Sequence, residues 1–137
     1  MSYLLDTNIC IALMTEGQSH VRRAFENAHQ AKQGVFVSTI VLYELRYGIA
    51  KSPHREKSQA RFDDFLRSPV QALPFDDQDA TEAGRIRSEL ERAKMPIGHY
   101  DTLIAGQALA RGLTLVTANV REFSRIKGLH WVDWAKR

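Results

Sequence analysis

Tyr3-Leu4-Leu5-Asp6-Thr7-Asn8 combines three residues suited to a buried β-strand with a carboxylate at the point where that strand should end. The apolar residues that follow predict a short helix directly after this turn. In open α/β sheets, ligands bind outside the carboxyl ends of the strands, because the loops at that edge face solvent. Asp6 therefore either caps the first helix or belongs to a functional site. Further acidic residues at the same sheet edge would favour the functional site.

The length and composition are those of one compact domain. The 137 residues, 44% of them hydrophobic, are enough for a single core spanning residues 1–137 without disulfides or a structural metal. The one cysteine, Cys10, lies among apolar residues, so we expect it in the core of a protein from a reducing, cytoplasmic compartment. No apolar run approaches the roughly twenty residues of a membrane span, and no signal peptide is recognised, so we expect no membrane attachment. The net charge of +3 identifies no partner by itself.

Short strand patterns alternate with helix patterns along the chain. Further strands are expected at about 35–38, 70–75, 113–117 and 129–132, and helices at about 20–31, 40–51, 55–66, 80–93 and 99–111. Residues 15–18 are expected to form a loop, Asp77 or Asp79 to cap the helix at 80–93, and the apolar helix at 40–51 to be mostly buried. The alternation predicts an α/β fold, in which helices cover both faces of a mostly parallel sheet of four to five strands.

Two further acidic residues stand at informative positions. Glu44 lies in the middle of the apolar helix and either faces solvent or is compensated by a cation or by strong hydrogen-bond donors. Asp101 lies in the first turn of its helix, where capping alone would explain a carboxylate. If the first and fourth strands are neighbours, these acids meet Asp6 at one sheet edge, where their repulsion calls for a divalent cation. Asn119 and Glu122, which follow the fourth strand, are candidates to complete such a site.

Oxygen ligands of this kind indicate Mg²⁺ or Mn²⁺ rather than zinc. The five histidines show no ligand spacing and the lone cysteine has no partner, which argues against a zinc site. The sequence also lacks a phosphate-binding loop of the Gly-x-x-x-x-Gly-Lys type, a Gly-x-Ser-x-Gly nucleophile elbow and a Gly-x-Gly-x-x-Gly dinucleotide fingerprint. The turn after the first strand lacks the second acid of the Asp-x-Asp phosphotransferases.

Four blocks of sequence, taken together, carry a resemblance to a known family. They are Leu4–Asn8, Ser38–Leu45 with Tyr47-Gly48, Pro96–Asp101 with Ile104-Ala105, and Leu115–Asn119 with Arg121–Phe123. In this order and at these separations, they resemble the PIN-domain ribonucleases, and more narrowly the VapC-type toxins of bacterial type II toxin–antitoxin systems. The resemblance covers nearly the whole chain.

The resemblance implies a PIN-like three-layer α/β/α fold and a Mg²⁺-dependent endoribonuclease, with Mn²⁺ as a substitute. Hydrolysis of the RNA phosphodiester would leave a 5′ phosphate and a 3′ hydroxyl. The metal would be bound by Asp6, Glu44 and Asp101, and Asn119 occupies a catalytic position at which many PIN domains have an acid. The implied supporting residues are Thr7, Ser38, Thr117 and Glu122.

The resemblance also implies partners. These are an RNA substrate, for which transfer RNA is a candidate, a second copy of the chain in a homodimer, and a VapB-type antitoxin that blocks the site. Operator DNA would be bound only through the antitoxin. We expect five arginines to guide RNA to the acidic site: Arg46, Arg85, Arg87, Arg121 and Arg125.

Two alternatives to a ribonuclease toxin remain open on the sequence. One is a catalytically impaired RNA-binding module with the PIN fold, which Asn119 would permit. The other is a metal-dependent DNA nuclease or phosphatase that uses the same acids. Intact Asp6, Glu44 and Asp101 argue against the first, and a preference for RNA over DNA would argue against the second.

Overall fold

A computed structural model describes residues 1–17 and 19–136 of the chain. Five strands form one sheet in the order β3-β2-β1-β4-β5, and every neighbouring pair is parallel. The strands are β1 (Ser2–Leu5), β2 (Gly34–Ser38), β3 (Gln71–Leu73), β4 (Thr114–Val116) and β5 (Trp131–Val132). The predicted α/β fold with a parallel sheet is therefore confirmed.

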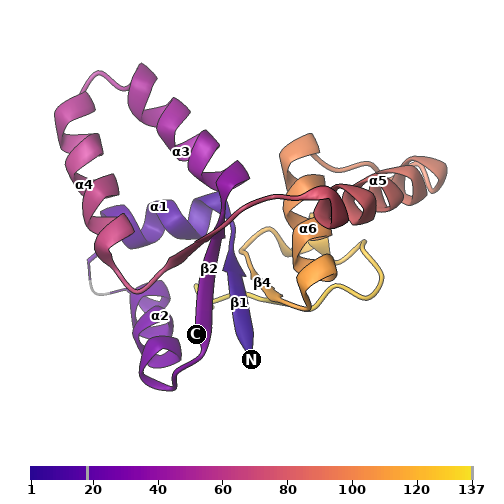
Figure 1. Cartoon of the computed structure of the whole chain (residues 1–137), viewed down its shortest axis with the longest axis horizontal. Helices are drawn as coiled ribbons and strands as arrows, with labels where there is room; N and C mark the ends of the chain where they lie inside the picture. Colours follow the sequence, from indigo (N-terminus) through magenta and orange to yellow (C-terminus); the bar gives the residue numbers. More distant parts are fainter. Residues whose placement is uncertain (18, 137) are drawn as a thin grey trace.

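Within the described residues, seven helices accompany the strands. They are α1 (Thr7–Thr15), α2 (His20–Gln30), α3 (Thr39–Lys51), α4 (Arg55–Arg67), α5 (Asp77–Arg92), α6 (His99–Arg111) and α7 (Val120–Phe123). Helices α1 and α2 lie on one side of the strands and α5 and α6 on the other, while α3 and α4 form a hairpin (Figure 1). In the described part of the chain, no helix is long and apolar enough to cross a membrane. Gln18, in the expected loop after the first helix, lies outside the described residues.

The register of the sheet brings the ends of three strands level. Leu5, the last residue of β1, is paired with Val37 of β2 and Val116 of β4. The Asp6 N–H continues the ladder by donating to the Val116 carbonyl at 3.1 Å. Residues that follow these strands therefore share one edge of the sheet, as the sequence predicted.

A single apolar core supports this edge. Leu4, Leu5, Val37 and Leu115 are fully buried in the sheet, and Cys10 is buried beneath it in α1, as predicted. Burial of aliphatic side chains stabilises the fold by about 1.5–3 kcal/mol each. The strands that carry the acidic residues are thus held by the most buried part of the protein.

Helices α5 and α6 cross in unusually close contact. A Cβ built on Gly106 of α6 would lie 2.6 Å from the Ala83 backbone of α5. At one end of the pair, Arg111 donates to Asp79 Oδ1 from Nε at 3.0 Å and to Asp76 Oδ2 from Nη2 at 2.9 Å. This packing fixes α6, whose first turn carries Asp101.

The structure corrects two expectations and adds one short helix. The prediction that the helix at 40–51 is mostly buried is wrong, because α3 buries only Val41 and Leu45 while Tyr43 and Tyr47 are 55% and 58% exposed. The cap of α5 is Asp76 rather than Asp77 or Asp79, because the Asp76 side chain accepts from the Asp79 N–H and the Asp79 side chain accepts from the Asp76 N–H. The short helix α7 had not been predicted.

Candidate active site

Asp6 directly follows β1 and caps α1 at the carboxyl edge of the sheet. Its Oδ1 accepts from the Ile9 N–H at 2.9 Å, and the residue is only 8% exposed. Burial raises the pKa of this carboxyl, and the negative charges of Glu44 and Asp133 raise it further, whereas hydrogen bonds from Thr117 and Ile9 lower it. Asp6 is thus both the helix cap and a member of an acidic cluster.

Glu44 joins α3 to the start of α1. The Thr7 hydroxyl donates to Glu44 Oε1 at 2.9 Å, and both residues are partly buried. This bond holds one carboxylate oxygen and leaves the other without a protein donor among the described contacts. Glu44 is therefore only partly exposed, and among residues 1–17 and 19–136 it is compensated by the Thr7 hydroxyl and not by an ion pair.

Asp101, in the first turn of α6, has the most strongly displaced pKa of the cluster. Its burial, followed by the neighbouring Glu122 carboxyl and the charges of Asp6 and Glu44, raises the pKa of Asp101 from 3.8 to about 6. Each of these causes penalises the negative charge of Asp101. The carboxyl groups are consequently close enough to destabilise one another when all are ionised.

Helix α7 brings Glu122 to this group. Asn119 precedes α7, and its Nδ2 donates to Glu122 Oε2 at 3.1 Å. The Asn119 N–H donates to the Thr117 hydroxyl at 2.9 Å, which ties the turn to the end of β4. Asn119 therefore orients Glu122 toward the cluster through its side-chain amide.

Asp133 is a further acidic residue that the sequence analysis missed. It follows β5 directly, and its negative charge raises the pKa of Asp6. Its Oδ1 also accepts from the Ala135 N–H at 2.8 Å. The signal was available, because the strand-end argument applied to Asp6 also applies to the residue after Val132.

The cluster carries an excess of negative charge. Within residues 1–17 and 19–136, the ion pairs of Arg and Lys side chains involve other acids, and none involves Asp6, Glu44 or Asp101. In the same residues, no three acidic, imidazole or thiol side chains converge closely enough to hold an ion as they stand. The donor chemistry fits a hard divalent cation, since carboxylate oxygens are the ligands that Mg²⁺ and Mn²⁺ prefer.

The remaining predicted residues are distributed around this edge and beyond it. Ser38 and Thr117 are fully buried, and Ser38 Oγ accepts from the Ile40 N–H at 3.1 Å as the cap of α3. On α5, Arg85 pairs with Glu82 and Glu89, and Arg87 pairs with Glu91. The structure places the other three predicted arginines as follows: Arg125 donates to the Pro96 carbonyl, Arg46 lies over the Phe62 ring, and Arg121 is exposed on α7.

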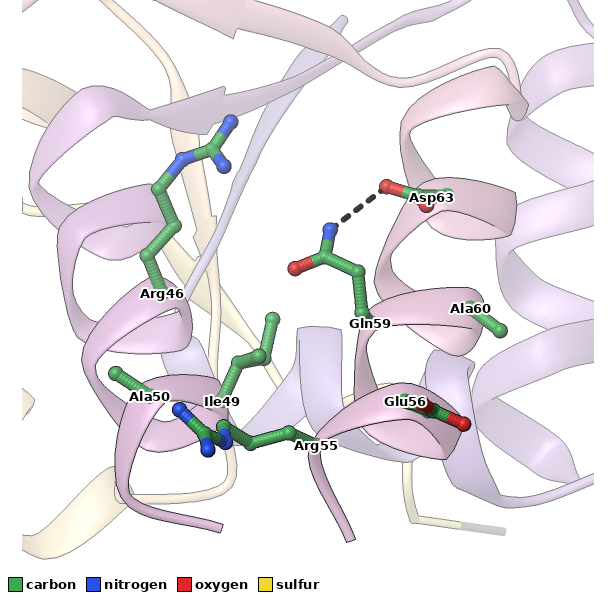
Figure 2. Close-up of a pocket in the computed structure, with 8 residues that line it drawn as sticks. All are labelled: Arg46, Ile49, Ala50, Arg55, Glu56, Gln59, Ala60 and Asp63. Atoms are coloured by element: carbon green, nitrogen blue, oxygen red, sulfur yellow. Dashed lines mark hydrogen bonds between the residues drawn. The ribbon is translucent and has the colours of Figure 1, made fainter.

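A separate hollow of about 580 Å³ lies between α3 and α4 (Figure 2). Arg46 and Ile49 line it from α3, and Arg55, Gln59 and Asp63 line it from α4. None of its lining residues belongs to the acidic cluster, so this hollow is not the candidate active site.

Known proteins share the sequence pattern and the fold of this chain. The model of the PIN domain family matches residues 3–129. The chain is 42% identical to the tRNA(fMet)-specific endonuclease VapC of Shigella flexneri over 135 residues, which cover 98% of this chain and 99% of that protein. A solved structure of VapBC2 from Rickettsia felis, bound to a DNA fragment from its promoter, matches with a TM-score of 0.91 and 36% identity over 98% of this chain and 99% of that one. DNA-bound VapBC from Salmonella typhimurium matches with a TM-score of 0.89 and 40% identity over 98% of each chain.

Proposed function

The chain belongs to the PIN domain family and, within it, to the VapC ribonucleases, and from this premise we propose that it is a Mg²⁺-dependent endoribonuclease toxin neutralised by a VapB-type antitoxin. The observation that carries the proposal is the nearness of Asp6, Glu44 and Asp101 at one sheet edge, where burial and the negative charge of neighbouring carboxylates raise the pKa of Asp6 and of Asp101. A cation held by these three carboxylates would remove that repulsion. Glu122 lies near Asp101 and Asp133 near Asp6, and both add to the negative electrostatic potential of the cluster.

A bound Mg²⁺ would activate water for attack on phosphorus and neutralise charge that develops on the phosphate oxygens. The chain's own part is to hold the carboxylates in place. The caps and hydroxyls described above fix one oxygen of Asp6 and one of Glu44, because Ile9 and Thr7 each donate to one of them. Partners of this kind orient a carboxylate and are typically needed for full metal affinity.

Asp101 is the part of the site that responds to protons. The neighbouring Glu122 carboxyl contributes, after burial, to the raised pKa of Asp101. Metal ligands must be deprotonated, so a proton held here competes with the cation. Asn119 places Glu122 for this contact, and we assign it this positioning role in place of direct ligation.

We assign partners by the same family membership. The solved relatives are VapBC complexes bound to DNA, a promoter fragment in the Rickettsia felis structure, so we propose a VapB-type antitoxin that covers the site and carries the complex to operator DNA. We further propose that the toxin is a homodimer that acts in the cytoplasm. Because the Shigella flexneri relative is named as specific for tRNA(fMet), initiator transfer RNA is the first substrate to test.

The test compares cleavage of transfer RNA and total RNA by the full chain, freed of any co-purified partner, with Mg²⁺, Mn²⁺ or EDTA. Asp6→Asn is the matched variant, because asparagine caps a helix as well as aspartate does and thus removes charge without removing the cap. We expect metal-dependent cleavage that the variant loses while its melting temperature is retained. Equal cleavage by both proteins, or cleavage of single-stranded DNA in preference to RNA, would contradict the proposal.

A further inference from the structure

The exposed face of α3 carries aromatic and basic side chains in alternation. Tyr43, Arg46, Tyr47 and Lys51 recur at the three- and four-residue spacing that places side chains on one helix face, and all four are exposed. Isolated exposed tyrosines need no explanation, but two on one face beside two cations form a continuous surface. We call these four residues, together with Tyr100 of α6, the tyrosine track.

The track ends at the acidic cluster. Tyr43 immediately precedes Glu44, and Tyr100 immediately precedes Asp101. Their ring centroids are 5.8 Å apart with the planes tilted by 45°, and the Tyr100 hydroxyl donates to Tyr43 Oη at 3.4 Å. Tyrosines from two different helices therefore meet near the cluster, since the pKa of Tyr100 is raised by its hydrogen bond with Tyr43 and also by the negative charge of Glu44.

The geometry of this pair decides how a flat ligand would bind. A base inserted between the rings would need van der Waals contact at about 3.5–4.0 Å on each of its faces, more room than the tilted pair leaves. The outer faces are free by comparison, since Tyr43 is 55% and Tyr100 is 44% exposed. A base would thus stack on the outside of the pair.

The rest of the track supplies positive charge along an apolar floor. The Lys51 ammonium lies 4.7 Å over the Tyr47 ring, and the Arg46 guanidinium lies 4.8 Å over the Phe62 ring, so both cations are held in place by aromatic faces. An open hollow of about 600 Å³ runs along Leu42, Tyr43, Arg46 and Tyr47. Aromatic faces interleaved with cations are the chemistry that binds single-stranded nucleic acid.

We propose that the tyrosine track binds unpaired nucleotides of the RNA substrate, with one base stacked on Tyr43 and Tyr100 beside the scissile phosphate and Arg46 and Lys51 contacting backbone phosphates. This proposal rests on the ribonuclease function proposed above. The positive charge of the track favours RNA over an uncharged apolar partner. Glu44 is the only acidic residue of α3, and its hydrogen bond with Thr7 holds it at the cluster and away from the track. The tyrosines are positioning residues, since they orient the strand without contacting the reacting atoms.

The experiment measures binding in EDTA, where no cleavage complicates it, by fluorescence anisotropy. The probes are a labelled ten-nucleotide oligouridylate and an abasic ribose-phosphate strand of the same length and charge. We expect Tyr43→Ala and Tyr100→Ala each to weaken oligouridylate binding by about fivefold or more and to leave the abasic strand unaffected. Lys51→Ala should weaken both probes alike, and Leu66→Ala, at an exposed apolar position on α4, should change neither.

Tyr43→Trp and Tyr43→Leu distinguish stacking on an aromatic ring from contact with any apolar side chain of similar size. Tryptophan should keep the preference for the strand with bases, and leucine, which keeps apolar volume without a ring, should lose it. The proposal is overturned if the alanine variants still bind oligouridylate more tightly than the abasic strand. If these variants also sediment as monomers where the wild type is a dimer, the track is a subunit contact instead. If the wild-type chain cleaves RNA but binds both probes equally, the proposed role of the tyrosine track is contradicted and the proposed ribonuclease function stands. If the chain prefers the strand with bases but cleaves no RNA, the ribonuclease function is contradicted and base binding by the track stands.

Discussion

The hydroxyl of Thr7 donates a 2.9 Å hydrogen bond to Glu44, which ties the first turn of α1 to the middle of α3 at the acidic cluster. These residues are 37 positions apart, and the bond is the direct link between the strand-end turn and the apolar helix. It makes the orientation of Glu44 depend on the turn that also holds Asp6.

Thr7→Val is therefore expected to lower Mg²⁺ affinity by about 10–100-fold, because the carboxylate loses the donor that orients it. The measurement is the Mg²⁺ concentration that gives half-maximal cleavage. Thr7→Ser keeps the hydroxyl and should remain close to wild type. An unchanged Mg²⁺ requirement in the valine variant would show that the bond does not organise the site.

Asp101 should make the metal-free protein less stable as pH rises. Its pKa is raised from 3.8 to about 6, so its favourable contribution is complete below pH 3.8 and is lost as pH rises through 6. In EDTA, Asp101→Asn should thus be more stable than wild type at pH 7 but not at pH 4. Melting temperatures across this range test the sign, and an advantage of the variant that is greatest at low pH would contradict it.

Asn119→Asp should make stability depend more strongly on Mg²⁺. The change replaces the amide that donates to Glu122 with a second carboxylate facing it, which should cost about 1–2 kcal/mol of unfolding free energy in EDTA. Added Mg²⁺ should restore more stability to the variant than to wild type. Equal stabilisation of the two proteins by Mg²⁺ would place residue 119 outside the metal's influence.

Gly106→Ala should loosen the contact that positions α6. The added methyl group would meet the Ala83 backbone at 2.6 Å, so we expect a loss of about 1–3 kcal/mol of unfolding free energy. Gly84→Ala is the matched control on α5, where a Cβ meets nothing within 4 Å and should stabilise by up to about 1 kcal/mol. Chemical denaturation of both variants measures the unfolding free energy, which should fall in Gly106→Ala and rise in Gly84→Ala.

The sequence predicted the residues whose position follows from strand order. Asp6 was found because a carboxylate after an apolar strand stands at the functional edge of a parallel sheet. Asp133 obeys the same rule but was missed, since β5 has only two residues and gives a weak pattern. The Asn119–Glu122 bond could not be predicted, because side-chain rotamers within a turn do not follow from periodicity.

The error on α3 has a different physical origin. Apolar content was interpreted as burial, but burial depends on whether another element covers each face of the helix. Val41 and Leu45 are covered, while Tyr43 and Tyr47 are not. The misjudged residues are the ones to which a role in RNA binding is now assigned.

The pairing of β1 with β4 delays the appearance of the proposed nuclease during its own synthesis. Asp6 is made early, but Asp101 and the β4 strand that aligns with Leu5 are made about a hundred residues later. At about 5–20 residues per second, this separation leaves roughly 5 to 20 seconds in which a ribosome-bound chain carries only part of the acidic cluster. The proposed metal site therefore cannot be complete until α6 and β4 have been synthesised and β4 has paired with β1.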